Sequence, residues 1–109
     1  ISVVSDQIGT PTYAGDLAKM ILNIVSSKNT NFGLYHYSNE GMVSWYDFAE
    51  AIFEVSAIEI KLNPIKTVDY PTPAKRPKYS TLDTKKVYDF FLVKPPSFKQ
   101  SLKKLIKSL

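Results

Sequence analysis

The sequence predicts a mixed α/β fold in the order β-α-β-α-β-loop-α-α. Short apolar or alternating segments, typical of strands, are interleaved with longer segments whose apolar residues recur at helical spacing. The chain has 109 residues, of which 44% are hydrophobic, and this is enough for one domain with a real core. We therefore treat residues 1–109 as a single domain and take its elements in chain order.

The first half of the chain predicts two strands and two helices. Residues 2–5 are β-branched and apolar, as in a strand end, and Thr12 is the expected N-cap of the first helix. The alternating aromatic residues 33–38 predict a strand, and Ser44 with Asp47 predicts a capping box for the second helix. The first apolar stripe consists of Leu17, Met20, Ile21, Ile24 and Val25. The second consists of Trp45, Phe48, Ala49, Ile52 and Phe53.

The second half predicts one strand, a long loop and two helices. Residues 58–65 read as a strand that Asn63-Pro64 ends, and three prolines between Pro71 and Pro77 exclude a helix there. Asp83 or Thr84 is the expected cap of a short helix, and Pro95-Pro96 break the chain before the last one. The expected apolar face of the last helix consists of Phe98, Leu102, Leu105, Ile106 and Leu109.

Composition excludes several classes of site. There is no cysteine and only one histidine, so a disulfide framework and a zinc site of the usual His/Cys type are ruled out, and we expect no metal. His36 lies within the expected strand 33–38 and is interpreted as a satisfied structural histidine. No apolar stretch approaches the roughly 20 residues that span a bilayer. We expect a soluble cytoplasmic protein without a membrane partner, and a chain that begins at Ile1 inside a strand reads as part of a longer one.

The net charge of +4 is unevenly distributed. Residues 1–60 hold two lysines against seven acidic residues, whereas residues 61–109 hold twelve basic residues against three acidic ones. A basic half suggests a phosphate-bearing partner, although the lysines of the last helix fit an ordinary solvated face. A nucleic-acid module is the weakest interpretation, because the aromatic residues fall on core stripes and are not interleaved with the lysines.

Two segments are candidate ligand sites. In the first, DQIGTPT, Gln7, Thr10 and Thr12 offer neutral donors and acceptors, and Gly9 allows close approach of a ligand. The second is KRPKYS, where Arg76 presents a fork of donors suited to phosphate on a loop stiffened by prolines. The residues alone leave open whether Arg76 is an ordinary surface cation. We expect Trp45 to be packed in the core rather than to wall a pocket.

Four segments together resemble the C-terminal, substrate-binding part of the dTDP-4-dehydrorhamnose reductases, which are extended short-chain dehydrogenase/reductases. They occur in the order of that family and span nearly the whole chain. The segments are DQIGTPT with Asp16-Leu17-Ala18, GLYH at 33–36, SWYDFA at 44–49, and PTPAKRP at 71–77 with Ser80, Leu82 and Asp83.

The resemblance implies NADPH- or NADH-dependent reduction of the 4-keto group of a dTDP-sugar. It implies that the glycine-rich cofactor loop and the Tyr-x-x-x-Lys pair belong to an N-terminal part absent here, so we assign no catalytic residue to this chain. Residues 1–38 would be the last Rossmann elements, and the rest a lobe closing over the sugar nucleotide, with Arg76 on its diphosphate. A homodimer is one assembly that this interpretation leaves open. The alternative is a non-catalytic relative resembling the regulatory β subunit of methionine adenosyltransferase.

Overall fold

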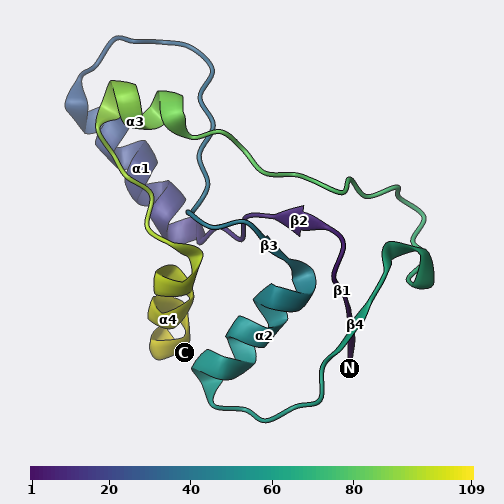
Figure 1. Cartoon of the computed structure of the whole chain (residues 1–109). Coiled ribbons are helices and arrows are strands. Elements are labelled where there is room, and N and C mark those ends of the chain that lie inside the picture. Colours follow the sequence, from purple (N-terminus) through teal and green to yellow (C-terminus); the bar gives the residue numbers. More distant parts are fainter.

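Four α-helices and two short two-stranded sheets form the structure, a computed structural model that describes residues 1–109 (Figure 1). The helices are α1 (Ala14–Ser27), α2 (Trp45–Ser56), α3 (Lys85–Phe91) and α4 (Phe98–Ser108). The predicted mixed α/β class is confirmed. The radius of gyration is 16.3 Å, against about 13 Å expected for a compact domain of this length. The chain is therefore elongated, and its helices do not share one core.

The first sheet pairs the strands at the two ends of the predicted β-α-β-α-β region. Strand β1 (Ser2–Val4) runs parallel to β4 (Asn63–Ile65), with Val3 opposite Pro64. The expected strand 58–65 is thus wrong over residues 58–62, because pairing starts only at the Asn63-Pro64 step that we expected to end it. The hydrogen bonds Asn63 N to Ile1 O and Ser5 N to Ile65 O face β1, so the missing amide of Pro64 falls on the outer edge, where proline is tolerated.

The second sheet contains two residues of the DQIGTPT segment, which is therefore not a simple turn. Strand β2 (Ile8–Gly9) pairs antiparallel with β3 (Val43–Ser44), and on its other side Ile8 forms a parallel bridge with Tyr79. The Cβ of any side chain at Gly9 would lie 2.8 Å from Ser80 Oγ. Glycine at position 9 is therefore explained by the close approach of residues 79–80.

Helices α2 and α4 pack against each other and hold the main core. Both begin with a capping box, in which Ser44 pairs with Asp47 as predicted and Ser97 pairs with Gln100. The Phe48 and Phe98 rings meet edge to face at 6.2 Å. The buried members are Ala51, Phe98 and Leu102, surrounded by Val43, Phe48, Ile52, Val55 and Ile106.

Helix α1 departs from its predicted start and burial. Its N-cap is Tyr13, which gives no side-chain cap, whereas Thr12 Oγ1 donates to Thr10 O and accepts from Asn39 N. The predicted Thr12 cap is therefore wrong, because that hydroxyl is already used by other backbone groups. Of the predicted stripe only Met20 is buried, and Val25 is 71% exposed.

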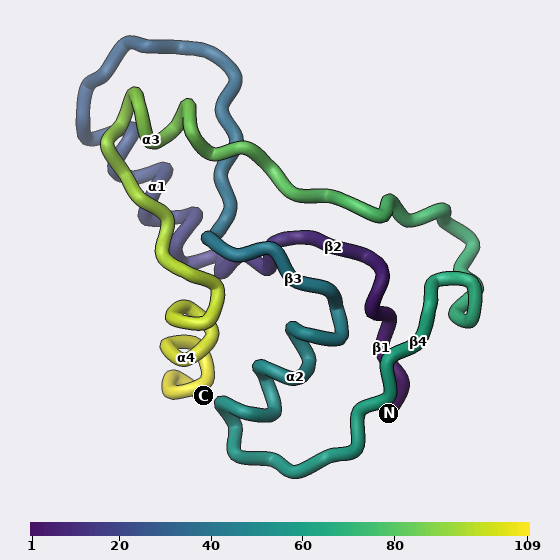
Figure 2. The backbone as a smooth tube through the Cα atoms, in the orientation of Figure 1, coloured from purple at the N-terminus to yellow at the C-terminus, as the bar shows by residue number.

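The expected strand 33–38 is also wrong as an element of this structure. No backbone hydrogen bond joins these residues to another strand, and Figure 2 shows the segment running down from an open loop to β3. The alternating pattern is present, but a strand requires a neighbour to complete its ladder. His36 in this segment is exposed and makes no hydrogen bond, so its interpretation as a satisfied structural histidine is wrong too.

A buried polar cluster joins α1, the turn before β3 and α4. Asn39 Nδ2 donates to Asp16 Oδ2 at 2.9 Å and to Ser101 Oγ at 3.2 Å, and its Oδ1 accepts from Tyr13 N at 2.7 Å. Ser101 Oγ also donates to Asp16 Oδ2. We call Asp16, Asn39 and Ser101 the polar cluster. It leaves no buried side-chain donor or acceptor unpaired, so its hydrogen bonds link the three segments. No helix of the structure has the length and apolar character needed to span a membrane.

Candidate functional site

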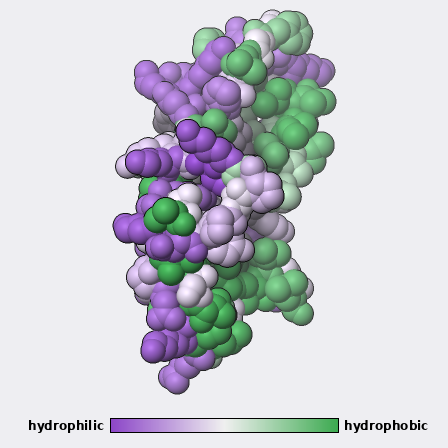
Figure 3. Space-filling view, turned by 90° about the vertical axis from the view of Figure 1, so that its right-hand side faces the viewer, coloured by the Kyte–Doolittle hydropathy of each residue, from purple (hydrophilic) through white to green (hydrophobic).

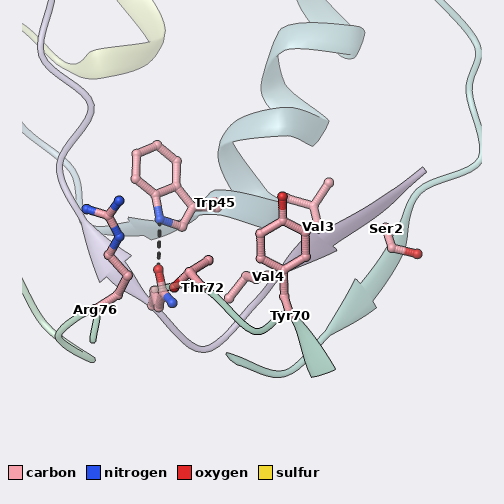
Figure 4. A pocket seen from close by; sticks show the side chains of 8 residues that line it. Ser2, Val3, Val4, Trp45, Tyr70, Thr72 and Arg76 are labelled. Atoms are coloured by element: carbon pink, nitrogen blue, oxygen red, sulfur yellow. Dashed lines mark hydrogen bonds between the residues drawn. The ribbon is translucent and has the colours of Figure 1, made fainter. Parts of the chain in front are cut away.

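A pocket of about 620 Å³ opens beside β1, the first turn of α2 and the loop that follows η1 (Thr67–Asp69) (Figure 4). Four of its eight lining residues are hydrophobic and four are polar or charged, a mixture that is usual in small-molecule sites. The lining residues are Ser2, Val3, Val4, Gln7, Trp45, Tyr70, Thr72 and Arg76.

Trp45 forms one wall of this pocket. Its side chain is 56% exposed, and its Nε1 donates to Gln7 Oε1 at 3.2 Å, the dashed line of Figure 4. The expectation that Trp45 is packed in the core is therefore wrong. The core face of α2 begins one turn later at Phe48, and the first position of a helix is free to turn toward another partner, here the amide of Gln7.

Arg76 lies at the same pocket and has no partner within the chain. It is the only charged residue of the lining, and the two ion pairs of the structure, Lys85–Asp89 and Lys99–Glu54, do not involve it. In the view of Figure 4, Trp45 lies between the Arg76 guanidinium and the Tyr70 ring. All five donors of Arg76 are therefore available to a ligand.

A second hollow of about 690 Å³ is lined by the same loop. Lys75, Arg76 and Lys78 line it together with Asp6, so Arg76 borders both spaces. Asp6 forms no ion pair with these cations, and its Oδ1 accepts from Thr67 N at 2.9 Å and from Thr67 Oγ1 at 2.7 Å. The hydrogen bond from the Thr67 hydroxyl is the main cause that lowers the pKa of Asp6 below its usual 3.8.

The other predicted site residues are divided among this pocket and two further spaces. Gln7 lines it with Arg76, whereas Gly9 and Thr10 line a small neighbouring hollow of about 140 Å³ that shares Trp45. Thr12 lies at a fourth space, between the start of α1 and the α2–α4 core. Figure 3 shows the face of the molecule that carries β4 and the loop, with hydrophobic residues along one flank and hydrophilic residues along the other.

Sequence reasoning missed Tyr70 and Thr72 as lining residues. Both lie in the proline-rich loop, immediately before and after Pro71. The available signal was their place in a loop that already held the favoured Arg76, because polar and aromatic side chains in a stiff loop are candidates for ligand contact.

Comparison with known proteins agrees with this geometry. Residues 1–109 match the family described as the RmlD substrate binding domain. The chain belongs to this family. It is 41% identical, over 96% of its length, to a dTDP-4-dehydrorhamnose reductase of Aggregatibacter actinomycetemcomitans, and it covers 39% of that protein. The resemblance inferred from the four sequence segments is thereby confirmed.

Solved structures of dTDP-4-dehydrorhamnose reductases show the same fold. The Bacillus anthracis enzyme, solved in complex with NADP, superposes with a TM-score of 0.93 at 35% identity, over 100% of this chain and 38% of its own. The Clostridium acetobutylicum enzyme gives 0.90 at 40% identity, over 99% of this chain and 38% of its own. This RmlD domain thus spans about two fifths of the length of the relatives that it matches.

The residues of this RmlD domain do not fit a dinucleotide cofactor. The four glycines, at 9, 15, 33 and 41, do not form the Gly-x-Gly-x-x-Gly turn that cradles a pyrophosphate. The strand-to-helix turn ends at α1, whose N-cap Tyr13 covers Gly15 with its ring, only 2.6 Å from where a Cβ would lie. No group of three or more His, Asp or Glu side chains is placed to hold a metal ion.

Proposed function

We propose that this RmlD domain binds the sugar nucleotide of an NADPH-dependent reductase that converts dTDP-4-dehydro-L-rhamnose to dTDP-L-rhamnose. The observation that carries the proposal is Arg76, a cation without a partner at the rim of a pocket shared with Trp45, Tyr70 and Gln7. The family and the fold support the reaction class. Within the reaction, this domain binds and orients the substrate, and we assign no proton or hydride transfer to its residues.

The pocket chemistry matches a nucleoside diphosphate sugar. Its volume of about 620 Å³ lies in the range of 300–1,000 Å³ found for small-molecule sites. The planar Arg76 guanidinium can pair with two phosphate oxygens at once. Lys75 and Lys78, which line the second hollow, add positive charge nearby without lining the pocket itself. The flat faces of Trp45 and Tyr70 offer stacking surfaces for a base or a sugar ring.

The reductant that we propose is NADPH, bound by another part of the enzyme. The support is the Bacillus anthracis relative, which was solved in complex with NADP, together with the misfit between this domain and a dinucleotide. The relatives and structures named above give no support to the regulatory, non-catalytic alternative.

Titration of dTDP into the protein and two Arg76 variants tests the proposal. Arg76→Ala should weaken binding by about 10- to 150-fold, because a hydrogen bond to a charged group contributes about 1.5–3 kcal/mol. Arg76→Lys should recover only part of the affinity, since a point charge does not reproduce the fork.

Lys107→Ala is the matched control, because this exposed cation lies in the last turn of α4. It should bind dTDP as tightly as the unmodified protein. Equal affinities for all three variants would remove Arg76 from the site and reduce it to an ordinary surface cation.

A further inference from the structure

The pocket loop is fastened to the rest of the molecule at two points only. Residues 68–77 make hydrogen bonds only with each other and with Lys66 and Thr67. The first point is Thr67, whose Oγ1 accepts a hydrogen bond from Gln7 and donates one to Asp6. The other is Ile8, whose N donates to Lys78 O at 2.7 Å and whose O accepts from Ser80 N at 2.9 Å. Three consecutive residues, Asp6 to Ile8, therefore hold both ends of the loop that carries Tyr70 and Arg76.

The first fastening is a directed chain of three hydrogen bonds. Trp45 Nε1 donates to Gln7 Oε1 at 3.2 Å, Gln7 Nε2 donates to Thr67 Oγ1 at 3.2 Å, and Thr67 Oγ1 donates to Asp6 Oδ1 at 2.7 Å. An indole N–H can only donate and a carboxylate can only accept, so the two ends set the direction of every bond between them. The amide of Gln7 and the hydroxyl of Thr67 thus each have a single permitted orientation.

We propose that this chain, Asp6–Thr67–Gln7–Trp45, positions the Trp45 wall and the Arg76 loop relative to each other. Asp6 and Thr67 are then positioning residues: neither lines the pocket that holds Trp45 and Arg76, yet ligand affinity depends on both. The inference rests on the proposed function for its ligand, dTDP. The positioning of Trp45 by the hydrogen-bond chain does not depend on that function. Bonds that run in one direction strengthen one another, so loss of the Thr67 hydroxyl should weaken the hold on both Trp45 and the loop.

The side-chain chemistry at position 67 supports this role. The hydroxyl group of Thr67 is both a donor and an acceptor in the chain, and the Thr67 backbone N–H also donates to Asp6 at 2.9 Å. Valine has the same shape without the hydroxyl, whereas serine keeps the hydroxyl and loses only a methyl group. This pair of substitutions separates the hydrogen-bond chain from packing at the same position.

The test follows Trp45 and dTDP binding in Thr67→Val and Thr67→Ser. Subtracting the emission of the Trp45→Phe protein isolates the signal of this indole, the only one in the 109 residues. In Thr67→Val the anisotropy of Trp45 should fall and dTDP affinity should drop by about 2- to 10-fold, the size expected from one hydrogen bond. Thr67→Ser should restore both. Thr30→Val, at an exposed threonine whose side chain makes no hydrogen bond, is the control.

A second variant keeps the test decisive if Thr67→Val does not fold. Gln7→Glu retains the acceptor for Trp45 but cannot donate to Thr67, so the anisotropy of Trp45 should fall as it does in Thr67→Val. Anisotropy is the readout for this variant, because Gln7 lines the pocket and a carboxylate there would repel the phosphates of dTDP. Unchanged Trp45 anisotropy in either folded variant, or unchanged dTDP affinity in Thr67→Val, would overturn the chain. Arg76→Ala separates the two proposals: it should weaken dTDP binding and leave Trp45 anisotropy unchanged. If dTDP does not bind at all, the proposed function fails while the anisotropy of Thr67→Val still tests the chain.

Discussion

The α2–α4 pair buries the apolar faces that its sequence pattern predicts. The region formed by α1, residues 33–38 and α3 has equally clear apolar patterns but leaves many of their side chains exposed. Both helices of the pair carry a capping box, and their apolar faces cover each other. In the other region the patterns are equally clear, yet large side chains remain open: Leu22 is 64% exposed, Val25 71% and Leu34 75%.

This difference shows what a sequence pattern specifies. A stripe or an alternation identifies a face that is suited to burial, but it does not identify the partner. For α2 the partner is α4 of the same domain. On α1 the only buried apolar residue is Met20, and in residues 33–38 the aromatic contacts are those of Tyr35 with Phe90 and Phe91 of α3. We therefore expect substitutions in the two regions to differ widely in their effect on stability.

The largest effect should come from the core of the helix pair. Phe98→Ala removes a buried ring that contacts Phe48 and should lower the free energy of unfolding by about 3–5 kcal/mol. Leu22→Ala, on the exposed face of α1, should change it by less than about 0.5 kcal/mol. Urea unfolding of both variants measures the contrast. A cost at Leu22 similar to that at Phe98 would mean that the face of α1 is covered in solution.

The polar cluster should give the next largest effect. Asn39→Ala leaves Tyr13 N, Asp16 and Ser101 short of a partner in a buried site, which costs about 1–3 kcal/mol for a neutral group. The control is Asn23→Ala, at an exposed helix position without hydrogen bonds. The same urea series measures it, and equal stabilities of the two variants would show that the cluster does not join its segments.

The caps should give a smaller contrast between the same two regions. Ser97 accepts from Gln100 N at the start of α4, so Ser97→Ala should cost about 1 kcal/mol. Thr84 occupies the N-cap of α3 without a side-chain bond, and Thr84→Ala should be close to neutral. Thermal unfolding of the two proteins compares them. A loss at Thr84 as large as that at Ser97 would contradict the assigned cap geometry.

The parts of the fold that could be predicted are those determined locally. Ser44 and Asp47 predict a helix start because a capping box needs only residues of one turn, and prolines 71 to 77 exclude a helix because each acts on its own backbone. The strand 33–38 could not be predicted correctly, because its ladder depends on a remote segment. For the site, the sequence identifies Gln7 and Arg76 as candidates on two separate segments, and the structure has both line one pocket. The exposure of Trp45 depends on a bond to Gln7 that helical spacing does not encode.

The smallest effect concerns Tyr37, which lies in the segment 33–38. Partial burial, and secondly the negative charge of Asp16, raise the pKa of Tyr37 above its ordinary 10.0. Because the folded state holds the phenol proton more tightly than the unfolded state does, this contribution to stability is complete below pH 10. It is lost as the pH rises from 10 through the raised pKa.

Tyr37→Phe keeps the ring and removes the titrating group, so its free energy of unfolding should decline less steeply than that of the unmodified protein above pH 10. Tyr79→Phe, at a tyrosine that is 72% exposed, is the matched control and should follow the unmodified protein. Urea unfolding between pH 9 and pH 11 measures the slopes. Parallel slopes for Tyr37→Phe and Tyr79→Phe would mean that residue 37 is freely solvated, and that the segment 33–38 does not rest against the polar cluster in solution.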